Sequence, residues 1–153
     1  MLRFKALPNR WIKVTAPVWA VLQENSAFLT KCVAMGLEIW RINLKLLKST
    51  AETIGAKLFV AKQATLIVPG LPESECDRCK YGNHGFDHNA HIQAYEGIYR
   101  VIEQEISPDS IIDVTKISGQ SESFHDHVYP TKKGTTQIAE IMSDFLLPHI
   151  GSE

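Results

Sequence analysis

The chain has 153 residues, which fits one domain and is long enough to bury a hydrophobic core. Hydrophobic residues make up 44% of the sequence and charged residues 22%, as in an ordinary globular protein. With 16 basic and 17 acidic residues the net charge is -1, which gives no electrostatic basis for binding nucleic acid. No stretch approaches the ~20 consecutive apolar residues that a membrane span needs.

The first 24 residues show no regular apolar period and are expected to be irregular. Basic residues near the start are typical of a signal peptide, but Asn9, Arg10 and Lys13 interrupt the apolar stretch that such a peptide needs. We therefore predict no targeting segment, and the compartment stays open. Three large apolar side chains in this segment are candidate core anchors: Trp11, Trp19 and Leu22.

Two helices are predicted next. Asn25 and Ser26 can cap a helix that runs to about Met35, where Gly36 is expected to interrupt it. A second helix follows and ends at Gly55, a natural residue just beyond a helix C-terminus. The apolar residues of this second helix are predicted to share one face: Ile39, Ile42, Leu46, Leu47 and Ile54. Its charged residues fall largely outside that face: Arg41, Lys45, Lys48 and Glu52.

The remainder alternates strands with helices. Residues 57–61 and 110–115 are predicted strands, residues 68–90 a loop or lid, and residues 117–130 a polar loop. A helix between the strands ends before Pro108, and a last helix begins near Thr131, whose hydroxyl can cap it. This order predicts an α/β fold with a mostly parallel sheet and helices on its faces. Because such sheets normally have about five strands, two strands indicate part of a domain.

The most specific motif is the loop before the last helix, Phe124-His-Asp-His-Val-Tyr-Pro-Thr-Lys-Lys-Gly-Thr-Thr-Gln-Ile-Ala-Glu140. It resembles the closing block of SGNH/GDSL-type hydrolases, in which D-x-x-H is followed by Pro-Thr, two variable residues, Gly and a helix with Ile-Ala-Glu. The resemblance covers roughly residues 37–147. It implies a three-layer α/β/α, flavodoxin-like fold whose N-terminal strands are missing, in a single SGNH hydrolase-like domain over residues 1–153 with a lid at 68–90.

The resemblance also implies an activity. Members of the family hydrolyse ester bonds, often acyl or acetyl esters of carbohydrates or lipids, through an acyl-serine intermediate and without a cofactor. Asp126 is the implied acid, which orients an imidazole that takes the proton of the serine. Counting back from Gly134, the family's histidine position holds Tyr129, and a tyrosine with a pKa of ~10 is a poor acceptor at neutral pH. His127 is therefore the candidate catalytic base, and the alternative is a loop histidine bonded to water or to a backbone carbonyl.

The nucleophile and oxyanion blocks of the family have no counterpart in the sequence. Gly-Asp-Ser, Gly-x-Ser-x-Gly and Gly-x-Asn-Asp are all absent, and Gly119-Gln-Ser121 lies in a loop that no helix follows. We therefore expect the chain to hold only the acid–base end of the site. It would be a truncated reading of a longer gene with Met1 as an internal start, which we prefer, or a degenerate copy, or half of a split protein. A sheet that lacks strands has an open edge, which predicts self-association.

A second group of residues points to a different class of protein. Cys76-x-x-Cys79 with His84 and His88 has the ligand types of a four-coordinate zinc site, although a zinc knuckle would have a cysteine where Asn89 stands. The alternative function is therefore a non-catalytic binding or interaction module with a zinc-stapled loop. Three further residues have structural interpretations: Asp113 as a cap near the sheet edge, Trp40 as a core anchor and His91 as a helix-surface residue.

Overall fold

The computed structural model describes residues 26–79, 81 and 86–150. Its helices are α2 (Ser26–Thr53), α3 (Glu73–Cys76), α4 (His88–Glu105) and α5 (Lys132–Leu146). Its strands are β1 (Val60–Lys62) and β2 (Ile111–Asp113), and short 3₁₀ turns lie at Pro108–Ser110, Val114–Ile117, Ser121–Ser123 and Leu147–His149. The predictions for residues 1–24 and for the Asn25 cap lie outside the described residues.

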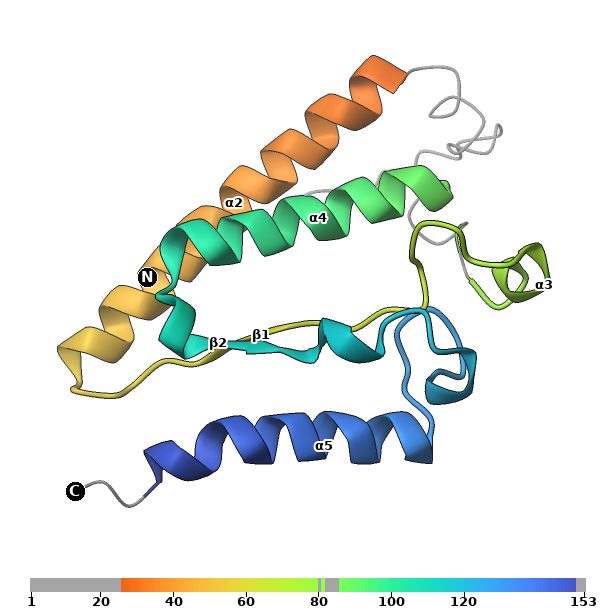
Figure 1. Cartoon of the computed structure of the whole chain (residues 1–153). Helices are drawn as coiled ribbons and strands as arrows, with labels where there is room; N and C mark the ends of the chain where they lie inside the picture. Colours follow the sequence, from red (N-terminus) through yellow and green to blue (C-terminus); the bar gives the residue numbers. More distant parts are fainter. Residues whose placement is uncertain (1–25, 80, 82–85, 151–153) are drawn as a thin grey trace, which may run out of the picture.

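The described elements form three layers. Figure 1 shows α2 and α4 on one side of the strands and α5 on the other. The two strands are parallel, with Val60 beside Ile111 and Lys62 beside Asp113, and α4 connects them. The predicted α/β class with a parallel sheet is therefore confirmed for the described residues.

Two hydrophobic clusters hold the layers together. Side chains alternate along β2, so Ile112 belongs to the cluster beneath α5 and Ile111 packs against the cluster beneath α2 and α4. Trp40 packs against the second cluster, as predicted. The buried residues of the first cluster are Ala64, Leu66, Ile67, Cys79, Ile112, Val114, Ile117 and Phe124, and those of the second are Leu44, Val101, Ile102 and Ile106.

Helix α2 differs from its prediction in two ways. It runs unbroken through Gly36, because one glycine inside a helix costs only about 1 kcal/mol and the surrounding residues favour helix. The face predicted to be apolar is also not the buried one. Leu44 and Ala51 are buried towards α4, whereas Ile39, Ile42 and Leu46 are exposed. The helix has two apolar faces, so its periodicity alone could not select between them.

The other predicted boundaries hold with small shifts. The first strand begins at Val60 rather than at residue 57, and the lid segment contains α3 and the start of α4, which Asp87 caps by accepting from the Ala90 amide at 2.8 Å. Thr131 caps α5, as predicted, by accepting from the Gly134 amide at 3.2 Å. Gly55 follows α2 with a φ of 69°, in the left-handed region that favours glycine.

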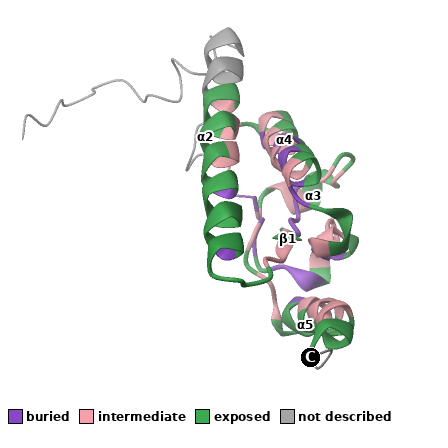
Figure 2. Cartoon of the chain, turned by 90° about the vertical axis from the view of Figure 1, so that its left-hand side faces the viewer, coloured by how far each residue is buried: buried purple, intermediate pink, exposed green. Residues whose placement is uncertain are grey.

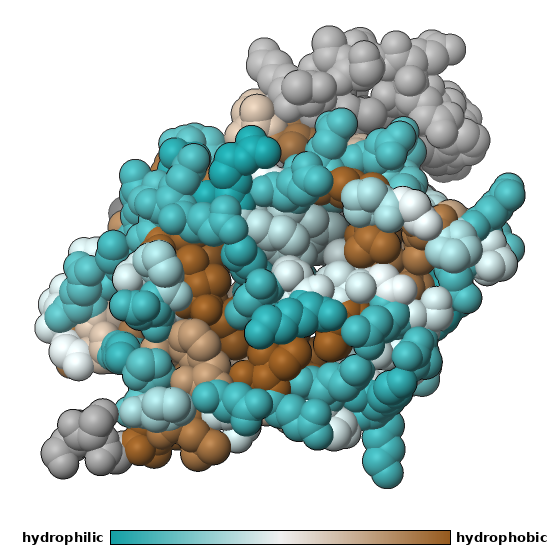
Figure 3. Space-filling view, in the orientation of Figure 1, coloured by the Kyte–Doolittle hydropathy of each residue, from teal (hydrophilic) through white to brown (hydrophobic). Residues whose placement is uncertain are grey.

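The sheet edge is open in the part of the chain that the structure describes, because each strand has one strand neighbour only. On the face seen in Figure 3, apolar side chains form a band over the sheet between α4 and α5, flanked by polar side chains. Self-association through this edge stays a prediction.

Candidate active site

Residues 124–130, the segment that leads into α5, form a closed loop. Phe124 and Pro130 form an antiparallel bridge at its base, and the His125 amide donates to the Tyr129 carbonyl at 2.8 Å. Inside the loop Asp126 is buried, and its Oδ1 accepts from the amides of Val128 and Tyr129, both at 2.9 Å. The Asp126 carboxylate therefore holds the turn that presents His127.

A second set of hydrogen bonds fixes His127 against the segment that follows β1. Its carbonyl accepts from the Leu66 amide at 3.0 Å and from the Thr65 hydroxyl at 2.7 Å. The residue is buried and lines a cavity, whereas Tyr129 is 67% exposed and does not line it. Of the two candidates at the motif, the histidine therefore faces the enclosed space and the tyrosine faces solvent.

The cavity beside His127 has a volume of about 350 Å³, within the range of small-molecule pockets. It lies at the carboxyl end of β1, where the chemistry of parallel α/β sheets gathers. A neighbouring cavity of about 190 Å³ shares Phe86, Ala94 and Ile98 with it. The residues that line the larger cavity are Gln63, Phe86, His91, Ala94, Tyr95, Ile98, His127 and Val128.

The polar side chains of this cavity can form hydrogen bonds with a bound molecule. Burial raises the pKa of Tyr95, with partial compensation from a hydrogen bond to Thr65, so the phenol is protonated at neutral pH and can donate. Gln63 adds an amide at the end of β1. No serine, threonine or cysteine is among the described residues that line the cavity, so these residues contain no hydroxyl or thiol nucleophile apart from the phenol.

His91 was predicted to lie on the helix surface, and this is wrong. The side chain is buried, its Nδ1 is 3.0 Å from the Asp87 carbonyl, and its ring centroid is 6.1 Å from that of His127. The spacing could have revealed this position, because His91, Tyr95 and Ile98 follow one helical stripe that continues to the buried Ile102.

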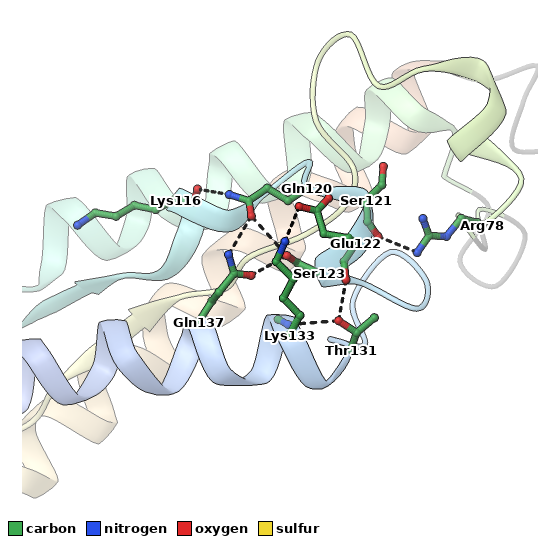
Figure 4. A network of polar contacts seen from close by, with 10 residues as sticks. Arg78, Lys116, Gln120, Ser121, Glu122, Ser123, Thr131, Lys133 and Gln137 are labelled. Atoms are coloured by element: carbon green, nitrogen blue, oxygen red, sulfur yellow. Dashed lines mark hydrogen bonds and ion pairs between the residues drawn. The ribbon is translucent and has the colours of Figure 1, made fainter.

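A polar network anchors the loop to α5 (Figure 4). The buried Ser123 hydroxyl donates to Gln137 Oε1 at 2.6 Å, and Gln137 Nε2 donates to Gln120 Oε1 at 3.1 Å. At the exposed rim, a hydrogen bond from Lys133 holds the pKa of Glu122 below its usual value. The network fixes the start of the loop, and Asp126 fixes its tip.

Arg78 joins the lid segment to the same loop. Its guanidinium donates to the carbonyls of Ser121, at 3.0 Å, and Phe124, and it pairs with Glu75. Ser121, the serine that the sequence analysis weighed as a nucleophile, begins the 3₁₀ turn Ser121–Ser123. It is not among the residues that line the cavity. The position of Ser121 therefore gives no support to a nucleophilic role at this cavity.

Three of the four residues of the zinc alternative, Cys76, Cys79 and His88, lie around Tyr81. The Tyr81 hydroxyl bonds to His88 Nδ1 at 2.7 Å, and His88 Nε2 bonds to the Val68 carbonyl at 3.0 Å, so both ring nitrogens are engaged. Cys79 is buried, which raises the pKa of its thiol. Within the described ranges no three His, Cys, Asp or Glu side chains are grouped to hold a metal, and His84 lies outside them. The zinc site stays a prediction.

Two further findings bear on the class of protein. In residues 26–79, 81 and 86–150 no helix is both long and apolar enough to cross a bilayer. Comparisons with models of protein families, with curated proteins and with solved structures found no match.

Proposed function

We propose that this chain is an SGNH hydrolase-like domain that carries the acid–base end of an ester-hydrolysing site. The observation that carries the proposal is the buried loop in which Asp126 accepts two backbone amides and His127 faces a cavity at the carboxyl end of β1. The three layers of Figure 1, with a parallel sheet between helices, agree with the flavodoxin-like fold of that family.

The geometry suggests a role for each group. The His127 imidazole takes a proton from an attacking hydroxyl, and Asp126 acts as a positioning residue because it holds the turn that carries the imidazole. Tyr95 and Gln63 can donate hydrogen bonds to the oxygen that gains negative charge when an ester carbonyl is attacked. A cavity of about 350 Å³ suits a small acyl group.

The proposal predicts negligible turnover by the chain alone, because the described residues that line the cavity include no serine. Hydrolysis of p-nitrophenyl acetate, followed as release of p-nitrophenol, should match the slow background of solvent-exposed histidines. His127 is buried and His125 is exposed in the same loop. The turnover rates of His127→Ala and His125→Ala should both differ little from that of the unmodified chain.

The opposite result would be equally clear. Rapid turnover that is lost in His127→Ala and kept in His125→Ala would show that the site is complete. The nucleophile would then lie outside the residues that we find around the cavity.

A further inference from the structure

Helix α2 presents an apolar face to solvent, directly opposite the face that packs on α4. Figure 2 shows the helix as mostly exposed along its length. The exposed apolar side chains of this face recur at spacings of four, three and four residues, and each is between 50% and 62% exposed. The members of this outer face are Met35, Ile39, Ile42 and Leu46.

The spacing of the outer face is that of a coiled-coil seam. Met35, Ile39, Ile42 and Leu46 occupy consecutive core positions of a heptad repeat, with β-branched residues at the centre. From Met35 to Leu46 the seam extends about 17 Å along the helix, a little under two heptads. The described part of the chain provides no element that covers this face, since α2 packs on α4 through its other side.

We infer that the outer face of α2 binds a second copy of this chain in antiparallel orientation. A two-fold interface is self-complementary, so each contact occurs twice. In the register that places Ile39 on the partner's Ile42, Met35 lies on the partner's Leu46, and the same four apolar side chains from each copy fill the seam. This inference is independent of the proposed function.

The charges beside the seam favour the antiparallel orientation. Glu38 and Lys45 lie one heptad apart on the same flank. Each has an ion pair within its own chain, Glu38 with Arg41 at 3.9 Å and Lys45 with Glu105 at 3.5 Å, yet both side chains stay more than half exposed and can reach a partner. In an antiparallel pair this flank meets itself, so that Glu38 of each copy lies near the partner's Lys45. In a parallel pair it would meet the other flank, where Gly36, Asn43 and Thr50 carry no charge.

Sedimentation equilibrium of the full chain tests the inference. We expect a monomer–dimer equilibrium that Ile39→Glu with Ile42→Glu weakens by about 100-fold or more, because four charges would enter the seam. Leu147→Glu, an exposed apolar residue after α5, is the matched control and should leave the equilibrium unchanged. Circular dichroism checks that α2 stays helical in each variant.

A charge exchange tests the orientation. Glu38→Lys alone and Lys45→Glu alone should each weaken the dimer several-fold at low salt, and the double exchange should restore it.

A dimer that the Ile39 and Ile42 substitutions leave intact would overturn the inference and point to the sheet edge. A monomer at every concentration would also overturn it. So would loss of thermal stability in Ile39→Glu at concentrations where the unmodified chain is itself monomeric, or binding of the chain to phosphatidylcholine–phosphatidylserine vesicles in place of dimerisation.

Discussion

Replacing Gly134 with alanine should lower the free energy of unfolding by about 3 kcal/mol, or prevent folding. A Cβ atom at this position would overlap the carbonyl oxygen of Ser123 and lie 2.9 Å from its carbonyl carbon and 3.1 Å from Cβ of Pro130. The two nearest of these atoms belong to the backbone and cannot rotate aside. Alanine gains about 1 kcal/mol in helix propensity over glycine, which is too little to offset the overlap.

Gly36→Ala is the matched control, because this glycine also lies in a helix but a Cβ there would meet nothing within 4 Å. That variant should gain about 0.5–1 kcal/mol. Urea denaturation followed by circular dichroism measures both changes. Equal stability of Gly134→Ala and the unmodified chain would contradict the close approach of α5 to the loop.

Replacing Asp126 with alanine should cost about 2–4 kcal/mol, because the amides of Val128 and Tyr129 would lose their charged acceptor in a buried loop. Asp126→Asn keeps an acceptor oxygen and should cost about 1 kcal/mol. Asparagine has nearly the same volume as aspartate, so Asp126→Asn tests the charge alone, whereas Asp126→Ala removes both the acceptor and the volume of the side chain.

Hydrogen exchange at the same two amides gives a local measurement. Exchange at Val128 and Tyr129 should accelerate strongly in Asp126→Ala and much less in Asp126→Asn. If both variants exchange like the unmodified chain, the Asp126 carboxylate does not hold the turn, and its positioning role fails.

Local chemistry made part of the fold predictable from the sequence. Thr131 caps α5, Gly55 follows α2 in the left-handed region, and Asp113 caps the turn after β2 by accepting from the amide and hydroxyl of Thr115 at 3.1 and 2.5 Å. Each of these features depends on residues within a few positions of one another. The parallel pairing of the strands followed from the helix between them.

Features that depend on tertiary contacts were not predictable in the same way. The sequence offered two apolar faces on α2, and the choice between them is made by α4, which packs on Leu44. His91 looks like a surface residue beside the polar lid, but its stripe on α4 turns it towards His127. The sequence motif therefore located two residues of the candidate site, Asp126 and His127. The structure added His91, Tyr95 and Gln63, which line the same cavity as His127.

We propose that His127 is a working base in a cavity whose described lining has no serine, threonine or cysteine. The Ala94→Cys variant tests this role most directly. Ala94 lines the same cavity, so the variant places a thiol there. With p-nitrophenyl acetate, the thiolate attacks the carbonyl carbon, an acetyl thioester forms, and p-nitrophenolate leaves as a burst of about one per chain beyond that of the unmodified protein. His127 would take the thiol proton, so adding His127→Ala should slow this burst by about tenfold or more, whereas His125→Ala should not. An additional burst of equal rate with and without the His127 imidazole would contradict the account.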